Sequence, residues 1–536
     1  MKVTSGYQIT SRIIWAWTLP LFIAAVALGT VRVSAQSTAN GGATPAAVDT
    51  SLPRSSVVEN SVVKIFATVR YPDPYKPWSK QAPSDFSGSG VVIKNKRILT
   101  NAHLVLYASQ VQVQANQSGN LLSATVEYVA PDIDLAVLKL DDETFFDSHK
   151  PLEWAAEVPQ QESTVMVYGY PLGGTVLSIT KGIVSRVEFA AYNATAGLRI
   201  QIDAAINSGN SGGPAVVGDK MIGLAYSRLT GSAQNIGYII PCEEIQMFLD
   251  DIADGHYDGK PTMLDEVQVL GNPTLYSFLN LSNSIHGVIV TKPDDAVPNN
   301  PLKKWDVITK IADTSVDDQG MINLDNNLRV FFKYLIQKTI KDDKVPMTVI
   351  RAGKEMRINM PVLKKHPRLI PDLNGAYPSY FVYGPMVFST ATSQFLTGVA
   401  AGNQAASRLA LLGVTGSPLM QRMGDKPVFE NEGLVVISSP FFPHRLSKGY
   451  NNPFMEVVKT VNGVSIKNLN HLVQVLRDSK DKYITIEFYG SVAPIFVFPR
   501  AEMATATEQI LLDNDIRTQG SADVMSVWNA SASGAK

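Results

Sequence analysis

The chain has 536 residues, 45% of them hydrophobic and 18% charged, which is the composition of a folded globular protein of about three domains at roughly 150 residues each. Its 47 Lys and Arg against 48 Asp and Glu give a formal net charge of -1, and no dense basic patch with interleaved aromatic residues occurs, so nucleic acid is excluded as an expected partner. The one cysteine, Cys242, excludes an intrachain disulfide, and its apolar context predicts a buried thiol rather than a catalytic one.

The N-terminus differs from the rest of the chain. Basic residues precede an apolar run at 13–31, and small residues of the kind a signal peptidase reads follow it up to Ala35. This layout predicts a secretory signal peptide over 1–35 and export to the periplasm or another extracytoplasmic compartment. An uncleaved anchor helix is the alternative, because about 19 apolar residues can span a bilayer, and only then is membrane contact expected. Residues 36–54 are rich in Ser, Ala, Gly and Thr and predict a disordered lead-in.

Residues 55–255 consist of short β-type runs separated by turn residues, such as "SVVKIFATV", "ATVEYVA" and "LRIQID". Many short strands at regular spacing predict an antiparallel barrel or sandwich rather than a βαβ fold. The first convincing helix, "PCEEIQMFLDDIAD" at 241–254, has its apolar residues on one face and closes this domain.

Two smaller units follow, at 262–365 and 376–500. Each has the order strand, strand with a polar turn, helix and strand pair, which predicts a repeated small α+β domain. In the first unit the helix is expected around "NLRVFFKYLIQKT" at 327–339. Residues 501–536 are predicted as a C-terminal extension that is partly disordered, because the end is rich in Ser, Ala and Gly.

The segment "DAAINSGNSGGP" at 203–214 is the first candidate for chemistry. A serine hydroxyl is a weak nucleophile that needs a base for its proton and N–H donors for the oxyanion that forms. Flanking glycines let the backbone turn sharply and aim its N–H groups at one point. The segment predicts Ser211 as nucleophile and an oxyanion hole in the backbone of Gly209, Asn210 and Ser211, with the N–H groups of Gly209 and Ser211 as the natural pair. An ordinary glycine-rich turn is the alternative.

His103 follows the strand-like "RILT", where an imidazole can accept the serine proton and later return it. Asp134 directly precedes the apolar strand "LAVLKL", where a carboxylate can bond the far ring nitrogen and orient the base. Asp132 is a close competitor on the same side by periodicity, and we choose Asp134 because it abuts the buried strand. The histidines form no metal-binding pattern with Cys or Glu, so neither a metal nor another cofactor is expected.

The order His103, Asp134, Ser211 separates two serine-hydrolase architectures. "GNSGG" also satisfies the elbow motif of α/β-hydrolases, but that fold places a helix after the serine and the acid and histidine later in the chain. Here a strand-like run follows Ser211, and the His and Asp lie upstream, so the pattern favours a mainly β, chymotrypsin-like double-barrel protease.

Several motifs then occur in the order seen in the Deg/HtrA family of serine proteases: "GSGVVI", "LTNAHLV", "DIDLAVLKL", "GYPLGG", "QIDAAINSGNSGGP" and "NIGYIIP". The chain resembles that family over about residues 57–252, and its C-terminal segments resemble the long plant-type members. The resemblance implies a trypsin-like double barrel followed by two PDZ-like domains, with His103 as base, Asp134 as orienting acid and Ser211 as nucleophile. It also implies a specificity pocket at 224–235.

The resemblance further implies an ATP-independent endopeptidase that degrades unfolded or damaged proteins in protein quality control and assembles as a homo-oligomer, a trimer or a multiple of trimers. We expect a peptide-binding segment in the first PDZ-like unit at Tyr276, Ser277, Phe278 and Leu279. Two alternatives are a chaperone-like peptide-binding protein and a protease that is latent until its loops at 169–175 and 224–235 are ordered.

Overall fold

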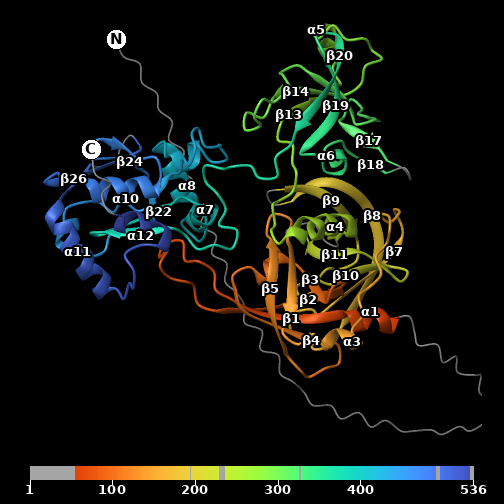
Figure 1. The fold of residues 1–536 in the computed structure, drawn as a ribbon, viewed down its shortest axis with the longest axis horizontal. Coiled ribbons are helices and arrows are strands. Elements are labelled where there is room, and N and C mark those ends of the chain that lie inside the picture. Colours follow the sequence, from red (N-terminus) through yellow and green to blue (C-terminus); the bar gives the residue numbers. More distant parts are fainter. Residues whose placement is uncertain (1–54, 193–194, 229–235, 325–327, 491–494, 531–536) are drawn as a thin grey trace, which may run out of the picture. The chain divides into compact units, whose positions relative to one another are not determined.

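The computed structural model describes residues 55–192, 195–228, 236–324, 328–490 and 495–530 (Figure 1). The predicted signal peptide at 1–35 and lead-in at 36–54 lie outside these residues, as does most of the predicted specificity loop, at 229–235. Within the described part of the chain, none of the helices has the length and apolar character needed to cross a membrane.

The first module contains two closed barrels of six strands each, with strand orders β1-β2-β3-β6-β5-β4 and β10-β11-β12-β9-β8-β7. The first barrel and its short helices are α1 (Ser55–Ser61), β1 (Val62–Val69), β2 (Ser84–Ile93), β3 (Arg97–Thr100), α2 (Ala102–Val105), β4 (Ala108–Ala115), β5 (Leu122–Ala130), β6 (Leu135–Leu140) and α3 (Phe145–Ser148). The second comprises β7 (Thr164–Gly169), β8 (Ser178–Tyr192), β9 (Thr195–Ile202), β10 (Pro214–Val217), β11 (Lys220–Arg228) and β12 (Gly237–Pro241), followed by α4 (Cys242–Asp251) and the 3-10 turn η1 (Ile252–Asp254). The predicted mainly β double barrel is confirmed.

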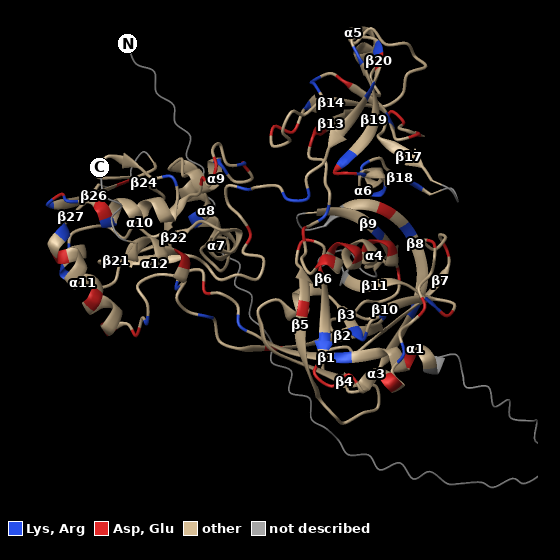
Figure 2. Cartoon of the chain, in the orientation of Figure 1, with Lys and Arg blue, Asp and Glu red and all other residues tan. Residues whose placement is uncertain are grey.

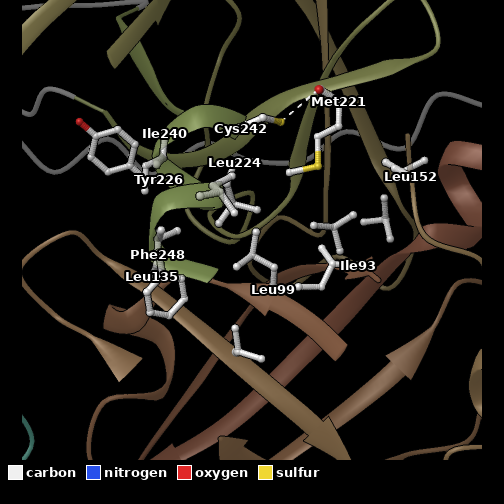
Figure 3. Packing of buried hydrophobic residues seen from close by; sticks show 14 of the residues in the cluster. Ile93, Leu99, Leu135, Leu152, Met221, Leu224, Tyr226, Ile240, Cys242 and Phe248 are labelled. Carbon is white, nitrogen blue, oxygen red and sulfur yellow. Dashed lines mark hydrogen bonds between the residues drawn. The ribbon is translucent and has the colours of Figure 1, made fainter. Parts of the chain in front are cut away.

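Besides the apolar cluster inside each barrel, another lies between the two barrels and under α4 (Figure 3). Leu99 and Leu135 come from the first barrel, Leu224 and Ile240 come from the second, and Phe248 comes from the helix. Packing these side chains against each other removes apolar surface of both barrels from water. That burial stabilises the folded state in this arrangement of the barrels. The barrels therefore form one rigid frame for residues that meet between them.

Cys242 belongs to this cluster, and its thiol donates to the main-chain oxygen of Met221 at 3.2 Å (Figure 3). Burial raises the pKa of the thiol to about 12. The residue is thus a buried structural thiol, as its apolar sequence context predicts.

A buried ion pair joins α4 to the segment that leaves the double barrel. The Lys260 Nζ atom lies 2.6 Å from a carboxylate oxygen of Glu244, with side-chain exposures of 7% and 4%. The other oxygen of Glu244 accepts from the N–H of Leu198 in β9 at 2.6 Å. Burial alone raises the pKa of Glu244, but the attraction of Lys260 and Arg199 outweighs it, so the pKa lies below its ordinary value.

Figure 2 shows the acidic residues on α4. Two of them, Glu243 and Glu244, lie in its first turn, where the helix dipole favours negative charge.

The second module is built on a sheet in the order β13-β14-β15-β19-β20, with β16 paired to β15, and a separate pair β17-β18. Its elements are β13 (Glu266–Val269), α5 (Pro273–Phe278), β14 (Val288–Lys292), β15 (Val307–Ile311), β16 (Thr314–Ser315), β17 (Met321–Asn323), β18 (Arg329–Phe331), α6 (Tyr334–Thr339), β19 (Lys344–Arg351) and β20 (Lys354–Pro361). The helix predicted at 327–339 is shorter than expected. Its first half is strand β18, because Val330 and Phe331, which favour extended structure, pair with β17.

The third module holds a four-stranded sheet in the order β25-β24-β26-β27 and a three-stranded sheet, β21-β22-β23. Its strands are β21 (Tyr380–Tyr383), β22 (Met386–Thr390), β23 (Val435–Ile437), β24 (Val458–Val461), β25 (Val464–Ser465), β26 (Tyr483–Phe488) and β27 (Phe496–Pro499). Its helices and 3-10 turn are α7 (Ser393–Val399), α8 (Ala405–Val414), α9 (Pro418–Gln421), η3 (Arg445–Ser447), α10 (Leu469–Asp478), α11 (Arg500–Asp513) and α12 (Ala522–Asn529).

The C-terminal extension differs from its prediction as a partly disordered segment. Residues 500–513 and 522–529 are helical, and Met503 and Val524 are fully buried in the same apolar cluster as the sheet residues Phe388 and Ile486. The large apolar residues Met525, Val527 and Trp528 pack against the same cluster. Only 531–536 remain outside the described residues.

Candidate active site

His103 lies on α2, the one-turn helix that follows β3. Its ring nitrogen Nδ1 lies 2.8 Å from one carboxylate oxygen of Asp134 and 3.0 Å from the other, and its backbone N–H donates to the same carboxylate at 2.9 Å. The Asp134 side chain is 5% exposed, whereas that of His103 is 46% exposed. A carboxylate can only accept, so Nδ1 carries the proton and Nε2 is left with a free lone pair. The geometry therefore holds a half-exposed imidazole by its Nδ1 edge against a buried carboxylate.

The backbone at Asp134 adopts φ +58°, a left-handed conformation that Asp and Asn tolerate better than most residues. The side-chain amide of Asn101, which is fully buried, donates to the main-chain oxygen of Asp134 at 2.9 Å. Asn101 thus holds the turn that presents the carboxylate to His103. Sequence reasoning missed this residue, although an Asn between a strand and a helix is a recognised capping signal.

Asp132, the competing carboxylate, has a different partner. Both of its oxygens accept from the hydroxyl of Tyr257, at 2.9 and 3.0 Å. Burial raises the pKa of the Asp132 carboxyl above its ordinary value. The structure brings Asp134 to the histidine and assigns Asp132 to a tyrosine near the end of the module.

The backbone before Ser211 forms a β-turn. The N–H of Asn210 donates to the main-chain oxygen of Asn207 at 3.0 Å, and Gly209, at the third position, has φ +99°. A positive φ at that position is the signature of a type II turn, which glycine adopts without strain. A Cβ added to Gly209 would lie 2.3 Å from the main-chain oxygen of Tyr170, so only glycine fits.

This turn leaves two backbone donors free. The main-chain oxygen of Ser208 accepts from the N–H of Leu172 at 2.8 Å. Because the oxygen and the N–H of one peptide group point in opposite directions, the N–H of Gly209 points away from Leu172. Among the described residues the N–H groups of Gly209 and Ser211 have no acceptor, as an oxyanion hole requires. Asn210 was expected in the same backbone donor set. Its N–H instead closes the turn, and its fully buried side chain has no hydrogen-bond partner among the described residues.

The residues expected to bind peptide in the second module lie on a short helix. Tyr276, Ser277 and Phe278 belong to α5, and Leu279 caps its C-terminal end. The Tyr276 hydroxyl donates to Asp318 at 3.0 Å, and Phe278 is 66% exposed. Whether this helix contacts a peptide stays a prediction. No group of three or more His, Cys, Asp or Glu side chains that could hold a metal ion occurs within the described ranges.

Comparisons with known proteins identify two domains in the chain. The family model described as a trypsin-like peptidase domain matches residues 88–224, and the model described as a PDZ domain matches residues 371–523. The PDZ match ends beyond residue 500, in agreement with the packing of α11 in the third module.

Two curated relatives come from Arabidopsis thaliana. Protease Do-like 4, mitochondrial, is 32% identical over 455 residues, which are 83% of this chain and 82% of the relative. Protease Do-like 2, chloroplastic, is 32% identical over 473 residues, 87% of this chain and 75% of the relative. A solved structure, the HtrA-type protease AlgW with decapeptide, is similar over 59% of this chain and 98% of that one, at 24% identity and a TM-score of 0.46. By its identity to relatives that it covers over most of their length, the chain belongs to the Do-like family of serine proteases, also called Deg/HtrA, with a trypsin-like peptidase domain and a PDZ domain.

Proposed function

We propose that this serine protease uses Ser211 as nucleophile, His103 as general base and Asp134 as the group that orients and stabilises the base. The observation that carries the proposal is the double hydrogen bond from His103 to the buried Asp134 carboxylate. It sets the tautomer that base catalysis needs.

The reaction follows from these positions. As the Ser211 hydroxyl oxygen attacks the scissile carbonyl carbon, its proton passes to Nε2 of His103, and Asp134 stabilises the imidazolium. The carbonyl oxygen becomes an oxyanion that accepts from the N–H groups of Gly209 and Ser211. The imidazolium then returns the proton to the leaving amine, and an acyl-enzyme remains. Water, deprotonated by the same base, attacks the ester and releases the acid and the free serine.

The proposed substrates are unfolded or damaged proteins, cleaved internally and without ATP. The second module offers a place to capture them, because β13 is at the end of its sheet and pairs only with β14 among the described strands. An extended chain can add to such an edge through main-chain hydrogen bonds, so an unfolded segment is preferred over a folded one. We further propose a homo-oligomer of three subunits or a multiple of three, and delivery by the N-terminal segment to a compartment outside the cytosol, since relatives have mitochondrial and chloroplastic names.

The test is cleavage of casein, and of a stable globular protein before and after it is denatured, by the full chain and by Ser211→Ala. We expect cleavage of casein and of the denatured form, a loss of about 10⁴- to 10⁶-fold in kcat for the variant, and labelling of the wild type alone by a fluorophosphonate. Equal cleavage by the variant contradicts the assignment of Ser211. An unlabelled wild type that still suppresses aggregation identifies the chain as a binding protein. Native mass measurement and the mass of the mature N-terminus test assembly and processing.

A further inference from the structure

Ser89 lies in β2 of the first barrel with its side chain fully buried. Its hydroxyl donates to the main-chain oxygen of Gly209 at 2.7 Å and accepts from the N–H of Tyr170 at 2.8 Å. Its own N–H donates to the main-chain oxygen of Ser211 at 2.9 Å, and its main-chain oxygen accepts from the hydroxyl of Thr100 at 2.8 Å. Ser89 of the first barrel thus forms hydrogen bonds to both Gly209 and Ser211 in the loop that carries the proposed nucleophile, here called the nucleophile loop.

These contacts bear on the orientation of the oxyanion donors. The hydroxyl of Ser89 holds the peptide that follows Gly209, and the N–H of Leu172 holds the peptide that precedes it through the oxygen of Ser208. A flip of the preceding peptide would turn the type II turn into type I and swing the N–H of Gly209 out of the site. Such a flip breaks the bond from Leu172 to Ser208, and the buried bond from Ser89 to Gly209 opposes the rotation of the next peptide that would have to accompany it.

We propose that Ser89 is a positioning residue for the oxyanion hole, which acts through its hydroxyl by joining Tyr170 to Gly209. The inference deepens the proposed function and rests on it. Ser89 touches no substrate in this role; it fixes the backbone that does.

The strand that carries Ser89 is packed tightly through its neighbours. A Cβ on Gly88 would lie 2.4 Å from Leu104, and one on Gly90 would lie 2.8 Å from Ile65, so the strand is packed tightly on both sides of the serine. If the hydroxyl is removed, the N–H of Tyr170 and the oxygen of Gly209 lose a common partner, and the glycines at 88 and 90 have no side chain that could take its place. The nucleophile loop is then free to sample the flipped turn.

The first experiment compares Ser89→Ala with Ser87→Ala in the full chain. Ser87 is in the same strand, partly exposed, and has no side-chain hydrogen bond among the described residues. We expect Ser89→Ala to lower kcat about 10- to 100-fold, less than the direct loss of an oxyanion donor, and to change KM by less than about threefold. Ser87→Ala should stay within about twofold of the wild type in both.

A second readout separates positioning from general loss of structure. A peptide aldehyde adds to Ser211 and places its oxygen where the oxyanion forms, whereas the corresponding acid binds without that bond. Ser89→Ala should weaken the aldehyde by about the factor lost in kcat/KM and leave the affinity of the acid unchanged. Equal weakening of both inhibitors, or an unchanged kcat, overturns the proposal.

Should Ser89→Ala fail to fold, Leu172 offers an independent test. Leu172 is the second residue of a turn closed by Gly174 and Pro171, with Gly173 at φ +78°, a position where proline is readily accommodated. Leu172→Pro removes the N–H that holds Ser208, and Leu172→Ala keeps it. We expect kcat for the proline variant to fall at least about 10-fold below that for the alanine variant; equal values overturn the proposed clamping of this loop. A wild type whose cleavage does not depend on Ser211 refutes the proposed function itself, whereas normal Ser211-dependent cleavage by Ser89→Ala refutes only the role of Ser89.

Discussion

Replacement of Asp134 by Asn tests the orientation of the base with a minimal change of shape. The carboxylate accepts from two donors of His103, the backbone N–H at 2.9 Å and Nδ1 at 2.8 Å. An amide has one acceptor oxygen and one NH₂ group, which can only donate. The backbone N–H cannot give up its proton, so it keeps the oxygen, and the NH₂ group faces Nδ1. The imidazole is then held with its proton on Nε2, where it cannot accept the proton of Ser211.

The expected loss follows from this tautomer. An amide in place of the orienting carboxylate of a serine-protease triad lowers kcat about 10⁴-fold, which corresponds to about 5 kcal/mol in the barrier. KM should change little, because Asp134 is buried and acts through His103. The assay measures kcat and KM on a fluorogenic peptide or on labelled casein at neutral pH, with unfolding monitored in parallel.

Asp132→Asn is the matched control, since it makes the same substitution two residues earlier. The Asp132 carboxylate accepts from the Tyr257 hydroxyl, and an amide oxygen can still accept that bond. We expect activity within about threefold of the wild type. The tautomer argument is wrong if Asp134→Asn keeps more than about a tenth of the wild-type kcat. It is also wrong if the loss of kcat in Asp132→Asn equals the loss in Asp134→Asn.

Three further predictions concern other groups of the first module and the segment that follows it. Glu244→Ala should destabilise the first module by about 3–5 kcal/mol in urea unfolding, because it leaves Lys260 charged, buried and unpaired, and Glu244→Leu combined with Lys260→Met should recover most of that loss. Equal stability of the wild type and the single variant would contradict the buried pair. Cys242, whose thiol pKa is raised to about 12, should react with iodoacetamide at pH 8 at least about 100-fold more slowly in the native protein than in urea; similar rates refute its burial. Asn101→Ala should lower kcat at least about 10-fold by releasing the turn at Asp134, with KM nearly constant, and a change confined to KM would assign Asn101 to substrate binding instead.

Residue type and chain order were enough to predict the class of fold, and they named the three residues proposed here as the triad. Short β-type runs predicted the barrels, and glycines around Ser211 predicted the sharp turn, because a positive φ and close backbone approach restrict that position to glycine. The upstream position of His103 and Asp134 separated this protein from α/β-hydrolases. These patterns depend only on residue types and their order along the chain, so they can be recognised without the tertiary structure.

Tertiary structure alone decided the partners of those residues. Asp132 and Asp134 are equivalent by periodicity, and only the distant residues Tyr257 and His103 distinguish them. The predicted helix at 327–339 became partly a strand because β17 was available to pair with it. Ser89 stands 120 positions before Gly209 in the chain, and its hydroxyl has a role only because the packing between the two barrels brings these residues within 2.7 Å. Such contacts depend on which surfaces are buried together, and that is a property of the folded chain as a whole.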